Sequence, residues 1–461
     1  MHPTQASRQH QQKRIQTHQS NADINGFYRL LSSDLLADEI SELSPEHRER
    51  IYPPTKTLSM FLTQAMSADR SCQNVVNQAV LQRVISDQNR ASTHTGAYCK
   101  ARQKLPLAMV SQLTRFLGQW VSKQTPEHWN WNGRSVRLVD GTTVTLPDTE
   151  ANQESFPQSS GQKPGLGFPI CRIVGITCLS SGVVLNAAMG RCCGKGSNEQ
   201  SLLRSIQDTF EVGDIVMGDA YFATYFFIAA MQARGVDIVM EQHGSRKLST
   251  DFRKGQRIGT RDHLIQLNKP KKRPDWMSEE QYLTAPVALR IRELKTGGKI
   301  LVTTLTDPKT YSKEDFKQFY KQRWHIELDI RNIKETLGMN ILSCKSPELA
   351  IKEVWVYLLA YNLIRLMMAQ SALHSDLMPR QISFKHCLQL WRCYLQICRA
   401  FDDKQLYELF MLMSEQRVGN RSGRIEPRAV KRRPKPFPLL TKPRHEARAD
   451  VRKNGHPKKL K

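Results

Sequence analysis

The spacing of apolar residues divides the chain into helical and strand-rich parts. From Phe27 to about Ser122 the apolar residues recur at helical spacing, as Val76, Val80 and Val84 do at intervals of four. After about Trp129 they gather instead into short runs bounded by turn residues, which is typical of strands. The pattern therefore predicts a helical N-terminal region followed by a sheet.

The sheet region alternates strands with helices. Residues 134–146 predict a strand that is broken at Asp140-Gly141, and residues 170–190 predict a hairpin that turns at residues 180–182. Next come a helix with Asn198 as N-cap, a strand, a second helix and a last strand, at residues 198–210, 214–219, 225–235 and 236–242. Three strands followed by this alternation predict an α/β fold with a mixed sheet edge.

The composition and the pattern of apolar residues change again at residue 242. Residues 242–273 carry ten Lys or Arg against two Asp, with glycine breaks and no long apolar run. A second hairpin follows, with its turn at Thr296-Gly297-Gly298. Long helical patterns then return, at residues 312–338, 347–372 and 380–400. We therefore predict that residues 242–308 form a β-rich insertion between the sheet and these helices.

The charge of the chain narrows its possible partners. The 461 residues carry a formal net charge of +25 and have a pI near 9.8, which indicates a nucleic acid or an acidic membrane surface as partner. No run reaches the roughly 20 apolar residues of a membrane span. The ten cysteines show no C-x-x-C spacing, and the N-terminus has no apolar signal segment, so we expect a cytoplasmic protein with reduced thiols.

Both ends of the chain are polar. Residues 1–25 are rich in polar side chains and are predicted to be disordered. The last 41 residues contain 15 Lys or Arg and 3 Asp or Glu, a net charge of 15 − 3 = +12. We expect this basic tail to be extended and to bind DNA without sequence preference.

A polar stripe runs along the predicted helix at 312–338. At about 100° per residue, Tyr320, Arg323 and Lys334 fall within about 40° of Glu327, beside the apolar face. A solvated face with an Arg323–Glu327 ion pair explains this stripe when it is considered alone. The other interpretation is the wall of a cleft that carries chemistry.

Two aspartates favour the second interpretation. Asp140 interrupts an apolar strand and Asp219 ends another. Each alone is more simply a residue that caps a loop. Together with Glu327, however, they supply the carboxylates that bind two Mg²⁺ ions in phosphodiester hydrolysis and transfer, with Mn²⁺ able to replace Mg²⁺.

The spacing Y-x2-R-x3-E-x6-K resembles the signature of bacterial insertion-sequence transposases of the DDE type, known as insertion-sequence family four. The resemblance covers most of the chain and includes the segments SCQNVV, THTGAYCKARQKLP, DGTTV, GDAYF and RRPKPFPLL. One departure is that Ala220, Tyr221 and Phe222 follow Asp219, where some members carry an arginine.

The resemblance implies an α/β fold whose RNase H-like catalytic core is interrupted by a β-rich insertion, with helical N-terminal and C-terminal regions. It also implies that Asp140, Asp219 and Glu327 form the metal-binding catalytic triad. The stripe residues beside Glu327, namely Tyr320, Arg323 and Lys334, would then contact phosphates of the transposon end. Trp324 either stacks on an extruded base or packs beneath the helix.

The expected organisation is a disordered tail, a helical DNA-binding region, a core in two segments, the insertion, a helical region and the basic tail. The boundaries are 1–25, 26–125, 126–241 with 309–372, 242–308, 373–424 and 425–461. We expect a DNA transposase that acts as a homo-oligomer on double-stranded DNA, both transposon ends and target, at the bacterial nucleoid and away from membranes. The alternatives are a decayed transposase that acts as a repressor or architectural protein, and an RNase H-like nuclease.

Overall fold

The computed structural model describes residues 39, 42–45, 51–194, 196–247, 249–397, 403–419 and 440–455. The expected disordered segment 1–25 and most of the basic tail lie outside these residues. The helices within them are α4 (Pro54–Met66), α5 (Cys72–Ile85), α6 (Gly96–Lys104), α7 (Leu107–Lys123), α8 (Glu150–Ser155), α9 (Glu199–Ser205), α10 (Tyr225–Ala233), α11 (Gly244–Lys247), α12 (Glu279–Thr284), α13 (Lys313–Lys321), α14 (Trp324–Arg331), α15 (Pro347–His374), α16 (Phe384–Ile397), α17 (Asp403–Glu415) and α18 (Arg444–Asn454).

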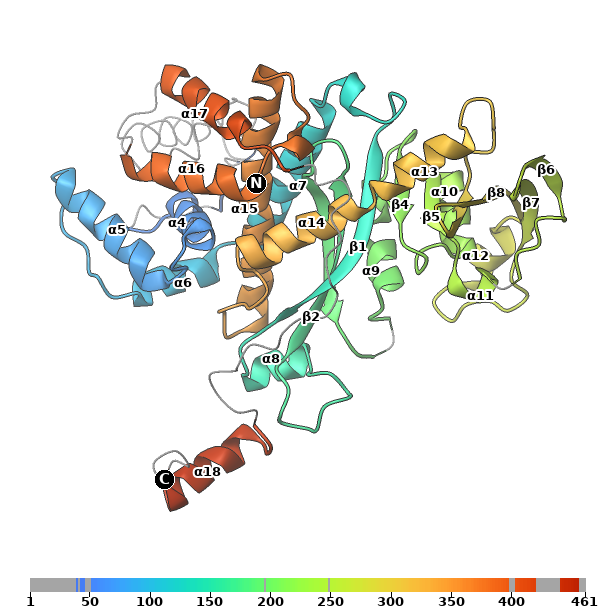
Figure 1. Cartoon of the computed structure of the whole chain (residues 1–461). Helices are drawn as coiled ribbons and strands as arrows, with labels where there is room; N and C mark the ends of the chain where they lie inside the picture. Colours follow the sequence, from blue (N-terminus) through green and yellow to red (C-terminus); the bar gives the residue numbers. More distant parts are fainter. Residues whose placement is uncertain are drawn as a thin grey trace.

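One mixed sheet of nine strands runs through the molecule (Figure 1). Its strands follow the order β3-β2-β1-β4-β5-β9-β8-β7-β6. Strands β1, β4 and β5 are parallel, and all other neighbours are antiparallel. The strands are β1 (Val136–Thr145), β2 (Ile170–Cys178), β3 (Val184–Arg191), β4 (Ile215–Gly218), β5 (Asp237–Glu241), β6 (Gln256–Gly259), β7 (Asp262–Asn268), β8 (Ala288–Thr296) and β9 (Lys299–Thr303).

The predicted β-rich segment at 242–308 continues this sheet. Its last strand, β9, pairs antiparallel with β5, with Glu241 opposite Leu301. Strands β8, β7 and β6 then follow outward by hairpin pairing. Because main-chain hydrogen bonds join β9 to β5, the outer strands have a fixed register relative to the central strands.

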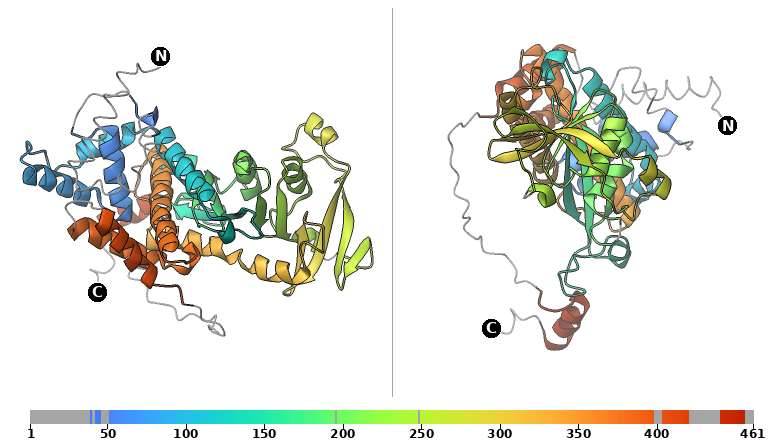
Figure 2. Two further views of the ribbon diagram at one scale, coloured as in Figure 1. Left: turned by 90° about the horizontal axis from the view of Figure 1, so that it is seen from above. Right: turned by 90° about the vertical axis from the view of Figure 1, so that its right-hand side faces the viewer.

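Helices cover both faces of the sheet. On one face, Phe316 and Phe319 of α13 and Ile326 of α14 pack on strand residues such as Leu138 and Met217. The opposite face carries α9 and α10, and α7 packs on β3 at the same end as α15 (Figure 2). Strand side chains alternate between faces, so this layering decides which residues of β1 and β4 face α14.

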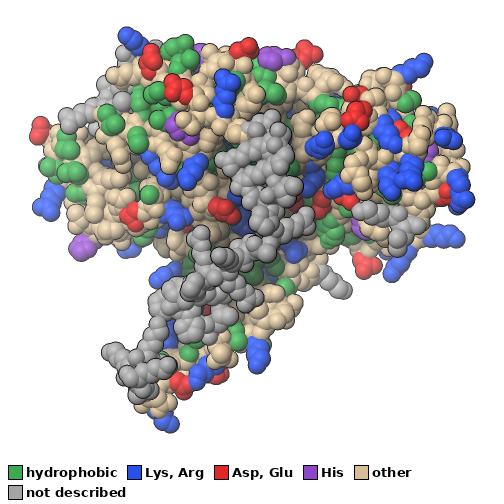
Figure 3. Space-filling model, viewed as in Figure 1, with side chains coloured by type: hydrophobic (Ala, Val, Ile, Leu, Met, Phe, Trp, Pro, Cys, Tyr) green, Lys and Arg blue, Asp and Glu red, His purple; other side chains and the backbone are tan. Residues whose placement is uncertain are grey.

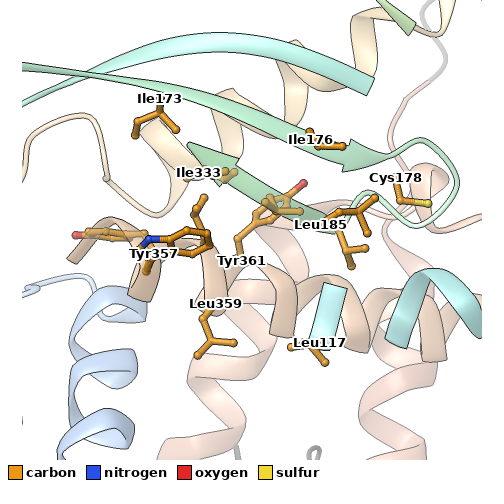
Figure 4. Close-up of a cluster of buried hydrophobic side chains, with 14 of the residues drawn as sticks. Leu117, Ile173, Ile176, Cys178, Leu185, Ile333, Tyr357, Leu359 and Tyr361 are labelled. Carbon is orange, nitrogen blue, oxygen red and sulfur yellow. The ribbon is translucent and has the colours of Figure 1, made fainter. Parts of the chain in front are cut away.

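Helix α15 forms the core of the helical end. It is long and apolar enough to cross a membrane, but 89% of that apolar window is buried inside the molecule, as in the core helix of a globular domain. Tyr357, Leu359 and Tyr361 of this helix lie below the hairpin residues Ile176 and Leu185 (Figure 4). Burial of these side chains joins the helical end to the sheet.

Three sequence-based expectations need correction. Strand β1 is unbroken, because Asp140 and Gly141 both pair with β2. The single helix expected at 312–338 divides into α13, α14 and a π-helical turn at Asn332–Thr336. The helix at residues 444–454 also replaces the extended chain expected in this part of the tail.

A buried charge cluster fixes α14. Asp329 is 0% exposed and receives hydrogen bonds from Arg365 at 2.6 Å, from Arg380 at 2.9 Å and from the Tyr361 hydroxyl at 2.8 Å. Burial alone would raise the pKa of Asp329, but Arg380 and Arg365 hold it below its usual value. The cluster therefore ties α14 to α15 and to the 3-10 turn Pro379–Gln381.

We predict that Asp329→Asn lowers the thermal melting temperature strongly, because it leaves two buried guanidiniums without a counter-charge. Breaking a buried pair in this way costs about 3–5 kcal/mol. The matched control is Glu314→Gln, which breaks the exposed Lys317–Glu314 pair on α13 and should hardly change the melting temperature. Equal melting shifts for the two variants would show that the cluster does not hold the helix.

Candidate active site

Two aspartates meet where β1 and β4 run in parallel. The register places Leu138 opposite Met217, so the next residues with the same orientation are Asp140 on β1 and Asp219 just beyond β4. Adjacent strands lie about 4.8 Å apart. Both side chains point to the face that α14 covers, because Leu138 and Met217 belong to the cluster beneath that helix. Asp219 also accepts a hydrogen bond from the Tyr221 amide at 2.9 Å.

Glu327 approaches these aspartates from α14. Its carboxylate accepts a hydrogen bond from Arg323 at 2.5 Å. Burial raises the pKa of Asp140 to about 6, and the neighbouring Asp219 and Glu327 carboxylates contribute, while the Gly141 amide and Arg323 act in the opposite direction. The three acids that the sequence singles out therefore interact electrostatically.

This arrangement suits a hard divalent cation in the chemistry of its donors. Carboxylate oxygens are the ligands that Mg²⁺ and Mn²⁺ prefer, and Asp140 has two further carboxylates and the Arg323 guanidinium within electrostatic range. Within the described residues, no three acidic, His or Cys side chains yet stand close enough together to hold one ion. Glu327 is paired with Arg323 through one of its two carboxylate oxygens.

Tyr320 lies at the buried side of the predicted stripe, where it interacts electrostatically with Arg323 and Asp219. The helix breaks between α13 and α14, and Tyr320 is only 7% exposed. Its hydroxyl donates to the Gly218 carbonyl at 3.1 Å and accepts from the Glu241 amide at 3.1 Å, and burial raises its pKa. The phenol thus secures the ends of β4 and β5 beside Asp219.

Lys334 and Trp324 lie on either side of Glu327 in the chain. The Lys334 ammonium donates to the Thr142 hydroxyl at 3.2 Å, two residues beyond Asp140 on the same face of β1. Burial lowers the pKa of this ammonium. The Trp324 ring is 57% exposed at the start of α14, so it does not pack beneath the helix.

Glu199 is a neighbour that the sequence did not assign to the site. Its helix-capping context is as expected, with Asn198 accepting from the Ser201 amide. Yet its carboxylate occupies the space beside Gly141, where an added Cβ would lie 2.3 Å from the carboxyl carbon. Burial raises the pKa of Glu199, and Asp219 adds to this while Arg172 opposes it. Glu199 therefore lies behind β1, on the face opposite Glu327.

The raised pKa of Asp140 gives a stability prediction. A folded-state pKa of about 6 against 3.8 means that the folded chain binds this proton more tightly, so the free energy of unfolding falls as pH rises through this window. Without divalent ions, Asp140→Asn should therefore stabilise the protein near pH 7.5 by on the order of 2–3 kcal/mol, and hardly near pH 4. Melting at the two pH values checks this, and an equal gain at both would contradict it.

Comparison with known proteins places this site in a family. The Transposase DDE domain family matches residues 131–363, just over half of the chain. The chain is 29% identical over 371 residues to the Escherichia coli K12 transposase InsG of insertion sequence element IS4, covering 77% of this chain and 80% of that protein. It is also 37% identical over 71 residues to the Escherichia coli transposase of insertion sequence element IS421, covering 15% and 19%.

A solved structure of a piggyBac transposase synaptic complex with hairpin DNA aligns with a TM-score of 0.43 and 10% identity, over 86% of each chain. The family match includes β1, β4 and α14, the elements that carry the three acids. The chain therefore belongs to the DDE transposase family, and it is a DNA transposase that cuts DNA strands and joins them to new DNA.

Proposed function

We propose that Asp140, Asp219 and Glu327 are the catalytic triad of this transposase. The observation that carries the proposal is the parallel register of β1 and β4, which sets Asp140 and Asp219 side by side beneath α14. The core would be RNase H-like and comprise residues 126–241 and 309–372, with the insertion at 242–308 between them. Its support is the mixed sheet with β1 at the centre of the core strands and helices on both faces.

The family generally uses divalent metal ions, and we infer that two Mg²⁺ ions serve here, with Mn²⁺ able to replace them. When bound, such a pair activates the attacking oxygen and stabilises the leaving oxygen of the phosphodiester. For this chain the main requirement is electrostatic. Asp140 must be ionised, which its pKa of about 6 allows at neutral pH. We also propose that Glu327 separates from Arg323 when it binds metal.

The exchange at Glu327 gives Arg323 a second role. Once released, its guanidinium is a planar donor beside the carboxylates, which suits bidentate contact with a phosphate. The Lys334 ammonium bonds to Thr142, two strand positions past Asp140, and would add a point charge beside the same DNA backbone. Tyr320 would position β4 and β5, and the exposed Trp324 is available to stack on a DNA base.

We further propose that the protein binds the terminal inverted repeats of its element as a homo-oligomer and then joins the freed 3′-OH to target DNA. The helices α4 to α7 and the basic tail would contribute to end binding, in the bacterial cytoplasm at the nucleoid. A repressor without catalysis would have no use for three acids held under repulsion at one edge. An RNase H-like nuclease that cannot rejoin DNA is not favoured, because the family match and the curated relative are transposases.

We predict that Asp140→Ala, Asp219→Ala and Glu327→Ala each abolish cleavage of a transposon-end duplex in Mg²⁺. Binding of that duplex should stay within a few-fold of wild type, because a metal ligand serves the reaction more than DNA affinity. Gel assays of cleavage and binding test both statements. Near wild-type cutting by any one variant would remove that residue from the triad.

A second prediction separates the phosphate contact of Arg323 from a simple helix ion pair. If Arg323 only forms an i,i+4 ion pair with Glu327, that pair would contribute about 0.3–0.5 kcal/mol of helix stability, and Arg323→Gln would leave cleavage nearly unchanged. Loss of a charge-assisted phosphate contact, about 1.5–3 kcal/mol, would instead slow single-turnover cleavage roughly ten- to a hundred-fold. Lys334→Gln should slow cleavage in the same way. Normal cleavage rates together with normal melting would show that neither residue contacts a phosphate in the reaction.

A further inference from the structure

The edge of the sheet that carries Asp219 extends into the outer strands. Glu241 at the end of β5 pairs with Leu301, so β9 begins beyond the end of β5 at this edge. Strand β8 ends at this edge, where Thr296 pairs with Lys299. Strand β7 begins at the same edge, where Asp262 pairs with Leu294. The β8–β9 turn and the β6–β7 turn therefore lie along the same edge as the acids.

Three exposed cations occupy this stretch of edge, and we call them the edge cluster: Arg261, Lys295 and Lys299. The Lys295 amide donates to the Arg261 carbonyl at 2.9 Å, so these two residues are adjacent. The Lys299 ammonium pairs with Glu241 at 2.8 Å and lies 5.5 Å from the centre of the Tyr320 ring. The edge cluster thus begins beside the phenol that secures the end of β4.

The charges of this cluster are largely unpaired. Within the described residues, neither Arg261 nor Lys295 lies within ion-pair distance of a carboxylate. Lys and Arg side chains also gather over the end of the molecule that holds β6 to β8 (Figure 3). Arg261 and Lys295 are thus exposed positive charges without a carboxylate partner, on the sheet edge that also carries Asp219. Such charges suit a DNA backbone that runs along this edge from the reacting phosphate.

The opposite end of the same strands offers a matched comparison. Lys271, Lys272 and Arg273 are also exposed and follow β7 at its far end, where Asn268 pairs with Ala288. Six residue steps of about 3.3 Å separate the two ends of β7, roughly 20 Å. These three side chains carry the same charge as the edge cluster, but they lie away from the edge that holds Asp219.

We propose that the edge cluster binds the backbone of the duplex that continues from the reacting phosphate, which rests on the proposed placement of that phosphate at Asp219. Four strand spacings of about 4.8 Å separate β4 from β7, roughly 19 Å. This span equals about six base pairs at 3.4 Å each. The bound DNA is either the transposon-side duplex or the flanking duplex, which share the same backbone chemistry.

The test compares two triple variants of the full chain, R261Q/K295Q/K299Q and K271Q/K272Q/R273Q. The affinity for a long duplex that contains the transposon end is measured by fluorescence anisotropy at several salt concentrations. EDTA is present, so that metal binding by the acids does not contribute to the affinity. The edge variant should bind about tenfold more weakly near 0.1 M salt, and its log–log salt slope should become shallower by about 2–3. The far-end variant should change much less, with both variants melting normally.

Two further substrates identify the DNA segment. Each is cut back to about four base pairs on one side of the scissile phosphate, shorter than the span of about six base pairs inferred above. The difference between variants should disappear for one truncation and persist for the other. Equal weakening by both variants, no weakening by either, or a difference that survives both truncations would overturn the proposal. Failure of the triad would show separately, as cleavage by Asp219→Ala.

Discussion

Three carboxylates lie near one another at a partly buried site, and burial and mutual repulsion both oppose their ionisation. The rest of the structure has to hold them there against this cost. Burial and the proximity of Asp219 and Glu327 raise the pKa of Asp140 to about 6, so these acids do not share this place without strain. The backbone holds them there: main-chain pairing sets the two aspartates in register, and the buried Asp329 cluster sets the helix above them. Arg323 provides a nearby positive charge through its pair with Glu327. The three acids therefore depend on a neighbouring cation to lower their mutual repulsion.

The same main-chain continuity links the acids to the outer strands. Because β9 pairs with β5, the strands at 256–303 form part of one sheet with the core strands. Helix α13 reinforces this connection, since Lys313 donates to the Thr260 carbonyl near one end and Tyr320 bonds to Gly218 near the other. A DNA backbone held on the outer strands would therefore keep a fixed distance from Asp219. The continuous sheet would therefore position several base pairs of DNA relative to the acids.

The sequence was enough to predict most helices and strands and to single out the three acids. It was less informative about which distant residues contact one another. Periodicity and turn residues were enough to predict the hairpin at Gly182, the Asn198 cap and the strands on either side of α10. Pattern alone could not show that β1 passes Asp140 unbroken, because an aspartate in a strand resembles a turn residue until its partner strand is known. The division of the long helix was missed because a helical wheel assumes constant rotation along the chain. The wheel also could not show that the Tyr320 hydroxyl bonds to the ends of β4 and β5. Asp329 is a lone acid near the apolar side of that helix, and only its distant partners Arg365 and Arg380 explain it.

The close packing of Glu199 on Gly141 has a consequence for how this family can vary. A side chain at position 141 and a glutamate carboxylate in its present place exclude one another, since the added carbon would come within 2.3 Å of it. A lineage that acquires alanine at this strand position would have to redirect or shorten the acid at the start of α9. The two sites lie in different elements and far apart in the chain, so their histories would be joined by a steric condition. Because the clash involves the flexible end of the glutamate, rotation of this side chain is the least costly response, and a larger residue at position 141 should move the Glu199 carboxylate away from β1.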